Sequence, residues 1–187
     1  TRYYTYAATL ALAMETAAKT GTPVWVLDRP NPIGPDLEGP LLGEGFESFV
    51  GLEAGMPIRH GMTVAALAEW YRVRRAPDCE LHIVPCSPYA PTVWVPPSPN
   101  MPTLDTAYVY PGMCLLEGTT LSEGRGTTSP FLCFGAPGID PLALAKRLMS
   151  YECPGVDFVP RVFRPEFGKH AGQLCGGATI RVFDATS

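Results

Sequence analysis

Proline is the residue that most constrains how this chain can fold. Four prolines fall within residues 96–102, and the chain holds 21 prolines and 19 glycines in all. Because proline fixes φ and removes a backbone donor, residues 96–102 are predicted to form a rigid, non-helical loop. The other prolines and glycines alternate with apolar segments, so we interpret them as turns between short elements rather than as a disordered tract.

The rest of the composition indicates a compact domain, or two small lobes, of 187 residues. The hydrophobic share is 46%, the charged share 17% and the formal net charge −4. No basic stripe indicates nucleic-acid binding, and no apolar run approaches the roughly 20 residues of a membrane span. The six cysteines include no CxxC pair, and the three histidines lack metal-ligand spacing. We therefore predict no metal and no cofactor.

Hydrophobic periodicity predicts an α/β arrangement at the start of the chain. Residues 5–20 are predicted to form an amphipathic helix that ends at Gly21. The apolar segment 23–28 is typical of a strand in a parallel sheet that is buried on both faces. A parallel strand needs a partner, and we expect that partner to precede Thr1. We therefore interpret the chain as a fragment of a longer one.

Further elements are predicted along the rest of the chain, and those of its second half form an α+β arrangement. Residues 33–57 are expected to form a long loop with a short element at 46–50, and Thr63 is expected to cap a helix. The buried face of that helix is predicted to hold Val64, Leu67, Ala68 and Tyr71. The other predicted elements are a strand at 79–85, a helix over 104–116 interrupted at 111–112, a strand at 131–134, a helix from 141 with Leu142, Leu144, Ala145 and Leu148 inside, a glycine loop at 167–177, and strands at 156–164 and 178–183.

Polar residues after the first predicted strand are candidates for a binding site. Asp28, Arg29 and Asn31 leave the carboxyl end of that strand, which is where open α/β sheets bind ligands. They form either a polar cluster at a cleft or an Asp–Arg pair that pins the loop. His60 precedes a predicted helix, whose dipole disfavours a positive charge on the imidazole. It is either a neutral hydrogen-bonding group of the site or a structural histidine.

Two further loops carry candidate residues. Ser98 and Asn100 lie in the proline-rich loop, where they either contact a ligand or form turns. Arg125 lies between two glycines, and it either pairs with Glu117 or Glu123 or holds an anionic substrate group. Glu117 follows an apolar run, so we expect it to be more desolvated than Glu123 and the better candidate for acid/base catalysis.

The inventory of reactive groups favours carbohydrate chemistry. The chain has no Gly-x-Ser-x-Gly nucleophile elbow, no phosphate loop and no dinucleotide-binding Gly-x-Gly-x-x-Gly after a strand. Carboxylates beside Arg, His, Asn and aromatic side chains are typical of sugar hydrolysis. Loops from several segments must converge to satisfy the hydroxyls of a buried sugar. We therefore expect Asp28, Asn31, His60, Ser98, Asn100, Glu117 and Glu123 to surround one cleft.

A series of motifs in these loops resembles a known family. In order they are RYYTY (2–6), VLDRPNP (26–32), FVG (49–51), HGMT (60–63), PSPNMP (97–102), YPG (110–112), EGT (117–119), SEGRGT (122–127) and CGG (175–177). Together they are similar to the NamZ-type exo-β-N-acetylmuramidases, glycoside hydrolase family 171, formerly a domain of unknown function. The resemblance spans essentially the whole chain.

The resemblance implies a fold and an activity. It implies the C-terminal part of a Rossmann-like parallel-sheet domain over residues 1–128 and a smaller α+β domain over residues 129–187. It implies exo-acting release of N-acetylmuramic acid from peptidoglycan-derived oligosaccharides such as MurNAc-GlcNAc, by a secreted or periplasmic protein. Catalysis would involve Glu117, Glu123 and His60. The substrate would contact Arg2, Tyr4, Asp28, Arg29, Asn31, Ser98, Asn100 and Arg125.

The chain departs from the family pattern in three places. The family carries a Pro-Glu-His-Gly segment upstream of the first motif, and the Glu of that segment is the favoured catalytic residue. The stretch between Pro85 and Trp94 is shorter than usual, and Thr120 and Leu132 replace Asn and Glu of many relatives. The alternative function is therefore a non-catalytic fragment that binds a muropeptide or a protein partner.

Overall fold

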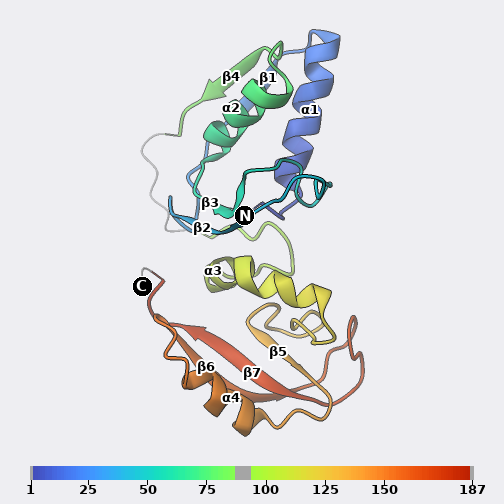
Figure 1. Cartoon of the computed structure of the whole chain (residues 1–187), viewed down its shortest axis with the longest axis vertical. Coiled ribbons are helices and arrows are strands. Elements are labelled where there is room, and N and C mark those ends of the chain that lie inside the picture. Colours follow the sequence, from blue (N-terminus) through green and yellow to red (C-terminus); the bar gives the residue numbers. More distant parts are fainter. Residues whose placement is uncertain (1, 87–93, 186–187) are drawn as a thin grey trace. The chain divides into compact units, whose positions relative to one another are not determined.

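The fold is mixed α/β and divides into two compact units. The computed structural model describes residues 2–86 and 94–185. The units are Thr1–Val93 and Trp94–Ser187 (Figure 1). The division into domains after residue 128 stays a prediction. Within the C-terminal unit, residues before position 128 are joined to residues after it. Ser122 pairs with Gly135 in a β-bridge, and the backbone N–H of Phe131 donates to the carbonyl of Glu123 at 2.7 Å. The stretch between Pro85 and Trp94 that was predicted to be shorter than usual falls largely on residues 87–93, which lie outside the described residues.

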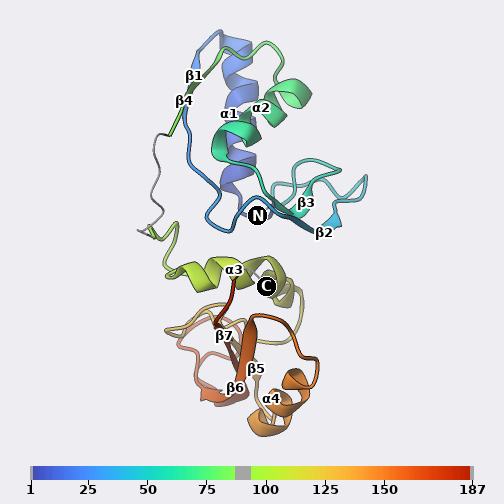
Figure 2. The same ribbon diagram turned by 90° about the vertical axis from the view of Figure 1, so that its left-hand side faces the viewer.

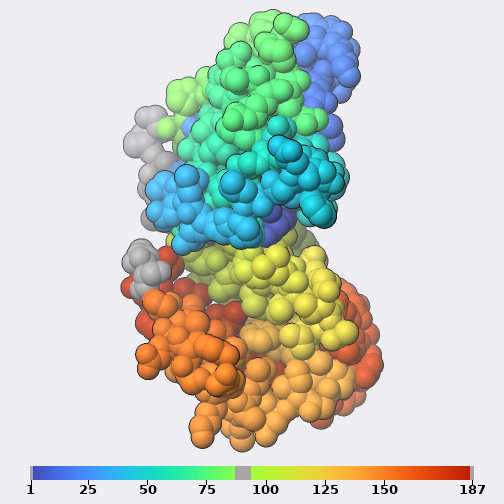
Figure 3. All heavy atoms as spheres, in the orientation of Figure 1, coloured from blue at the N-terminus to red at the C-terminus, as the bar shows by residue number. Residues whose placement is uncertain are grey.

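The N-terminal unit contains two helices and two small sheets. Its elements are α1 (Tyr6–Thr20), β1 (Val24–Leu27), β2 (Leu37–Leu41), β3 (Pro57–His60), α2 (Val64–Arg75) and β4 (Leu81–Val84). The antiparallel pair β2–β3 occupies the region predicted as a loop. Sequence patterning missed β2 because it contains Gly39 and Pro40 and is exposed along its whole length. Only an isolated bridge between Ser48 and Gly51 marks the element expected at 46–50, and this part of the connection lies on the unit's surface (cyan in Figure 3).

The parallel partner of β1 within the described residues is β4, with Val24 opposite Leu81 and Leu27 opposite Val84. This pairing was not predicted, and a partner preceding Thr1 on the other edge of β1 stays a prediction. Burial of β1 on both faces was wrong. Helices α1 and α2 cover the same face of the β1–β4 pair (Figure 2), so Val26 is buried while Trp25 and Leu27 are 64% and 63% exposed.

Helix α1 ends and helix α2 begins at the residues that the sequence predicts. Gly21 ends α1 in the left-handed conformation, with φ 65°, and its N–H donates to the carbonyl of Ala17. The Thr63 hydroxyl accepts from the N–H of Ala66 and caps α2. The core between the helices and β1 contains Met14, Ala17, Val26 and Ala68. Val64 had been assigned to the buried face, but it is the first residue of α2 and is 40% exposed.

The C-terminal unit is built on a three-stranded antiparallel sheet. Its elements are α3 (Leu104–Met113), the 3-10 helix η1 (Cys114–Gly118), β5 (Cys133–Ala136), α4 (Pro141–Met149), β6 (Val156–Phe163) and β7 (Cys175–Val182), with strand order β5-β7-β6. Thr103 and Asp140 cap α3 and α4 as their sequences indicate. Helix α3 continues through Pro111, whose missing N–H removes one hydrogen bond from the helix, and changes to 3-10 geometry at Cys114. Leu142 is 70% exposed, so its assignment to the buried face of α4 was wrong.

Strand β7 begins inside the segment predicted as a glycine loop. A Cβ atom at Gly176 would lie 1.9 Å from the carbonyl oxygen of Ile139, and one at Gly177 would lie 1.9 Å from that of Phe134. The two glycines therefore let neighbouring backbones approach closely inside a strand, as glycine does in strand interiors.

No helix among the described residues combines the length and the apolar character needed to cross a bilayer.

Candidate functional site

The loop after β1 is tied to the N-terminus of α2. Oδ1 of Asp28 accepts hydrogen bonds from the backbone N–H groups of Ala65 at 2.9 Å and Arg29 at 2.8 Å. The bond from Ala65 is the main reason that the pKa of Asp28 is lowered. Asp28 therefore pins the loop, as one interpretation expected, but it does so by capping α2 rather than by pairing with the exposed Arg29 side chain.

Asn31 and His60 meet at the backbone of Met62. Nδ2 of Asn31 donates to the carbonyl of Met62 at 3.4 Å, and Nδ1 of His60 accepts from the N–H of Met62 at 3.2 Å. Gly61 makes this possible, because a Cβ at its φ of 64° would lie 2.1 Å from the carbonyl oxygen of Pro35. Asp28, Asn31 and His60 thus come together in the N-terminal unit.

His60 is a neutral imidazole at ordinary pH. Its side chain is buried, with 7% of the residue exposed, and burial lowers its pKa to about 4. A neutral imidazole was predicted on the basis of the helix dipole, whereas desolvation is the larger cause of the lowered pKa. Because Nδ1 accepts a hydrogen bond, the proton lies on Nε2, and no described residue accepts from Nε2.

Arg2 and Tyr4 lie beside the β2–β3 sheet. The Arg2 guanidinium donates to the carbonyl of Pro40 at 3.2 Å and to that of Met56, so it ties β2 to the segment before β3. Tyr4 is half-buried, and its ring meets that of Tyr6 edge-on at 5.1 Å. The described contacts of Arg2 are therefore internal to the unit.

The proline-rich loop in the C-terminal unit is a series of turns around Met101. The Ser98 hydroxyl accepts from the N–H of Asn100 at 3.2 Å, and its carbonyl accepts from Met101 at 3.0 Å. Nε1 of Trp94 donates to the carbonyl of Met101 at 3.3 Å. Ser98 is thus a turn former, and the half-buried Asn100 side chain makes no hydrogen bond to a described residue.

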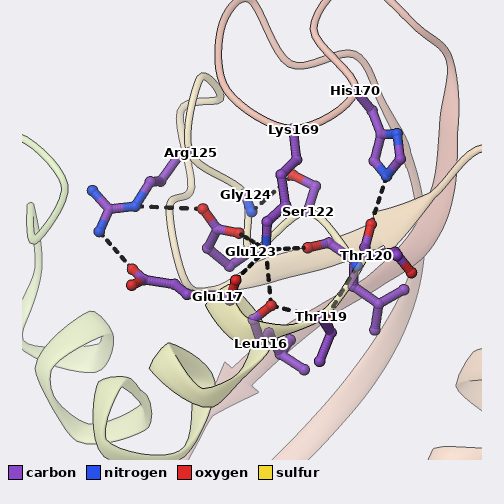
Figure 4. A network of polar contacts seen from close by, with 11 residues as sticks. Leu116, Glu117, Thr119, Thr120, Ser122, Glu123, Gly124, Arg125, Lys169 and His170 are labelled. Carbon is purple, nitrogen blue, oxygen red and sulfur yellow. Dashed lines mark hydrogen bonds and ion pairs between the residues drawn. The ribbon is translucent and has the colours of Figure 1, made fainter.

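Four charged side chains form a cluster in the C-terminal unit, which we call the charged cluster (Figure 4). Nη2 of Arg125 lies 2.6 Å from Oε1 of Glu117, and its Nε lies 3.4 Å from Oε1 of Glu123. Nζ of Lys169 lies 3.3 Å from Oε2 of Glu123. The Arg125 guanidinium also stacks over the ring of Phe131 at 4.9 Å. Two acids and two bases thus balance one another.

The order of burial of the two glutamates is the reverse of the prediction. The Glu123 side chain is 6% exposed and that of Glu117 is 43% exposed. Glu117 is the last residue but one of the short helix η1 and is exposed, whereas Glu123 lies between the buried residues Ser122 and Gly124. The apolar run before Glu117 was misleading, because Leu115 within it is itself 57% exposed.

Lys169 and His170 belong to the same network, and the sequence reasoning missed them. Nζ of Lys169 donates to the carbonyls of Leu116, Glu117 and Leu121 at 2.9, 3.0 and 3.1 Å. Nε2 of His170 donates to the carbonyl of Thr120 at 2.7 Å. No sequence signal could have found these contacts, since the partners are backbone atoms about fifty positions away in the chain.

Two other features bear on the chemistry. Among residues 2–86 and 94–185, no three His, Cys, Asp or Glu side chains are grouped so as to hold a metal ion. A shallow apolar depression beside α1 contains no titratable side chain, so it offers no acid or base; it is lined by Thr9, Leu12, Ala13, Thr16, Ala17, Thr20, Thr22 and Phe49.

The single cleft predicted for seven residues would combine groups from both units, and it stays a prediction.

Comparisons with known proteins decide the family. The model of the N-terminal part of exo-β-N-acetylmuramidase NamZ matches residues 1–105, and the model of its C-terminal part matches residues 108–187. The chain belongs to the NamZ family. The resemblance found in the sequence is therefore confirmed.

Similar proteins are about twice as long as this chain. The peptidoglycan β-N-acetylmuramidase NamZ of Bacillus subtilis (strain 168) is 45% identical over 193 residues, which cover 98% of this chain and 46% of the relative. Two crystal structures of DUF1343 family proteins from Bacteroides fragilis NCTC 9343 share the fold. One has a TM-score of 0.88 at 31% identity and the other 0.76 at 32%, and the chain covers 51% and 49% of them.

Proposed function

We propose that this chain is part of an exo-acting glycoside hydrolase that releases N-acetylmuramic acid from the non-reducing ends of peptidoglycan fragments, including MurNAc-GlcNAc. Membership of the NamZ family supports the reaction class. The observation that supports muramyl sugars as the substrate class is the charged cluster. In it a half-exposed Arg125 is held in place by two carboxylates and an aromatic ring, at the surface of a rigid loop.

Arg125 is proposed to bind the lactyl carboxylate that distinguishes muramic acid from glucosamine. Its Nη1 makes no hydrogen bond to a described residue, and Nη2 has a second proton beyond the one directed at Glu117. The ring of Phe131 fixes the plane of the guanidinium, which reduces the entropy lost on binding. A charge-assisted hydrogen bond of this kind contributes roughly 1.5–3 kcal/mol.

The other candidate residues have distinct proposed roles. Glu117 reaches solvent and can exchange a proton with a bound sugar, whereas the buried Glu123 is surrounded by Arg125 and Lys169 and orients them. In the N-terminal unit, His60 offers Nε2–H as a neutral donor to a sugar oxygen. Asn100 offers an amide. These roles follow from what each group can donate or accept.

The reaction is proposed to occur outside the cytoplasm, in the periplasm or the medium, since peptidoglycan is an extracytoplasmic polymer. Fractionation of cells that express the full-length protein tests this. Recovery in the cytoplasmic fraction alone would contradict it.

Product analysis tests the activity itself. The full-length protein that contains this chain is incubated with MurNAc-GlcNAc and with longer glycan strands, and the products are separated by mass. An exo-muramidase releases free N-acetylmuramic acid and shortens strands from one end. Internal oligosaccharides would contradict exo action, and no released sugar from any substrate would contradict hydrolysis.

A non-catalytic binding module is the second candidate. It is favoured by the fact that Asp28, Ser98, Glu117 and Glu123 all make intramolecular contacts in the structure. Under this alternative, the full-length protein would bind muramyl saccharides in calorimetry and leave them intact after prolonged incubation.

A further inference from the structure

We infer that Lys169 is a positioning residue of the proposed site, and that its ammonium fixes the loop 117–125 from which Glu117 and Arg125 are presented. The inference rests on the proposed function for its effect on catalysis. It rests on the geometry of the charged cluster for the contact itself (Figure 4).

The Lys169 ammonium has as many backbone acceptors as it has protons. The carbonyls of Leu116, Glu117 and Leu121 lie 2.9, 3.0 and 3.1 Å from Nζ. An ammonium carries three N–H donors on a flexible stem, so one group satisfies three acceptors that converge from different directions. Lys169 thereby joins both ends of the turn that separates η1 from Ser122.

Two of these carbonyls, those of Glu117 and Leu121, accept from no other described residue, whereas the carbonyl of Leu116 also accepts from the N–H and the hydroxyl of Thr119 at 3.0 and 2.8 Å. Leu116 and Glu117 lie near the C-terminal end of η1, where the local potential is negative. A cation at this end is favourable. Lys169, which lies in the loop between β6 and β7, therefore supplies the positive charge that is favourable at the C-terminal end of η1.

Lys169 also supplies a counter-charge to Glu123. Oε2 of Glu123 is buried and receives no hydrogen bond from the described residues, and Nζ lies 3.3 Å away. The other carboxylate oxygen faces Nε of Arg125 at 3.4 Å. Loss of the lysine charge would leave a buried carboxylate with Arg125 as its remaining neighbour, and would draw Arg125 inward, away from a substrate.

The backbone around the network is held in an unusual conformation. His170 and Phe131 are two of the three non-glycine residues described with positive φ, at 58° and 61°. His170 follows Lys169 and holds Thr120 of the same turn, and Phe131 lies under the Arg125 guanidinium. Left-handed non-glycine residues cost energy and gather at sites where the surrounding structure imposes a geometry. Both of these act on the one loop.

Arginine is not expected to replace lysine at this position. A guanidinium is planar, and its donors form a fork that suits one carboxylate rather than three converging carbonyls. A simple ion pair with Glu123, in contrast, would be preserved in Lys169→Arg. Comparing Lys169→Met with Lys169→Arg therefore distinguishes the effect of the hydrogen bonds to the three carbonyls from the effect of the positive charge alone.

The catalytic test uses the full-length protein and a muramyl substrate. We expect Lys169→Met and Lys169→Arg to raise KM by about tenfold, which corresponds to about 1.4 kcal/mol, because Arg125 is displaced, and to lower kcat as well, because Glu117 is presented from the same loop. Lys146→Met, which removes an exposed lysine on α4, is the control and should leave both constants unchanged. A reduced kcat with unchanged KM in the Lys169 variants would indicate a smaller folded fraction and overturn the inference. Full rescue by Lys169→Arg would also overturn it.

A chemical measurement tests the contact without any activity. In the wild-type full-length protein, reductive methylation of lysines is followed by peptide mass spectrometry. Lys169 should react at least about tenfold more slowly than Lys19 and Lys146, because its ammonium is held by three acceptors. Equal rates would overturn the inference even if the variants fail to fold. Protection of Lys169 in a protein that hydrolyses no muramyl substrate would refute the proposed function and leave the contact standing.

Discussion

The imidazole of His60 has its properties set by burial. In water a histidine titrates near pH 6.5, but inside the N-terminal unit the charged form loses its hydration, and the pKa falls to about 4. The N–H of Met62 occupies Nδ1, so Nε2–H is the group left to interact with a ligand. A neutral donor of this kind can bind a sugar oxygen over the whole neutral pH range.

The lowered pKa of His60 predicts a pH dependence of stability. The folded state disfavours the protonated imidazole, so the stability contributed by the neutral form is fully present above pH 6.5 and is lost as the pH falls from 6.5 towards 4. The loss should approach about 1.4 kcal/mol per pH unit within that window. Urea unfolding of wild type and His60→Gln between pH 7.5 and 4.5 measures it. The variant should have the flatter profile, and parallel profiles would show that His60 is not the group responsible.

Single residues also show where prediction from sequence succeeds. Thr63 was predicted as a helix cap, and Thr103 and Asp140 cap their helices in the same way, because a cap depends on its immediate neighbours. The cap that Asp28 supplies to Ala65, 37 positions away, could not be predicted in this way. The burial order of Glu117 and Glu123 was wrong for the same reason, since it is set by contacts that the local sequence does not contain.

At the scale of elements, the loop between η1 and β5 is the best-defined part of the candidate site. Gly124 and Gly126 have φ of 82° and 79°, and a Cβ at either would lie within 2.5 Å of a backbone oxygen. The glycines on both sides of Arg125 allow a close approach of the protein's own backbone, at Cys133 for Gly124 and at Phe167 for Gly126.

A matched pair of glycines tests how tightly this loop is packed. Gly124 and Gly138 share a φ of 82°, but a Cβ at Gly124 would lie 2.4 Å from the carbonyl oxygen of Cys133, while one at Gly138 meets no atom within 4 Å. Gly138→Ala should cost about 1–2 kcal/mol for the left-handed conformation. Gly124→Ala should cost roughly a further 1–3 kcal/mol from overpacking. Denaturant unfolding measures both, and equal losses would contradict the packing.

The helices and most strands were predictable because their periodicity and caps are local. Helix α1 begins and ends close to its predicted residues, and helices α2 and α4 begin where they were predicted to begin. Strand β2 and the start of β7 were missed, because their glycines and proline are typical of loops and only the approach of another backbone explains them. The mixed α/β fold class was confirmed, and the pairing of β1 with β4 was not foreseen.

At the scale of the whole molecule, the most conspicuous surface is the open face of the β1–β4 pair. Trp25 and Leu27 project from it, and Val84 beside Leu27 is 40% exposed. Trp25 stacks on His82 with ring centroids 4.3 Å apart. Large exposed apolar groups in one place favour association.

The open face predicts dye binding by the expressed chain 1–187. Fluorescence of a hydrophobic dye should rise in its presence and fall at least about twofold in the double variant Trp25→Thr, Leu27→Thr, because the apolar area is concentrated there. Leu37→Thr, at a residue 69% exposed on β2, is the control and should have little effect. Little dye binding by the wild-type chain would contradict this description of the surface.

Arg125 is proposed to give this protein its selectivity for muramic acid. The direct measurement compares kcat/KM of the full-length protein for a chromogenic muramide and for the same compound with its lactyl carboxylate esterified. Arg125→Met is set beside the control Arg147→Met, which removes an arginine stacked on Tyr151. We expect Arg125→Met to lower kcat/KM for the free acid by roughly 10- to 150-fold, which corresponds to the loss of about 1.5–3 kcal/mol, and to leave kcat/KM for the ester unchanged. Equal losses on both compounds, or no loss on either, would contradict it.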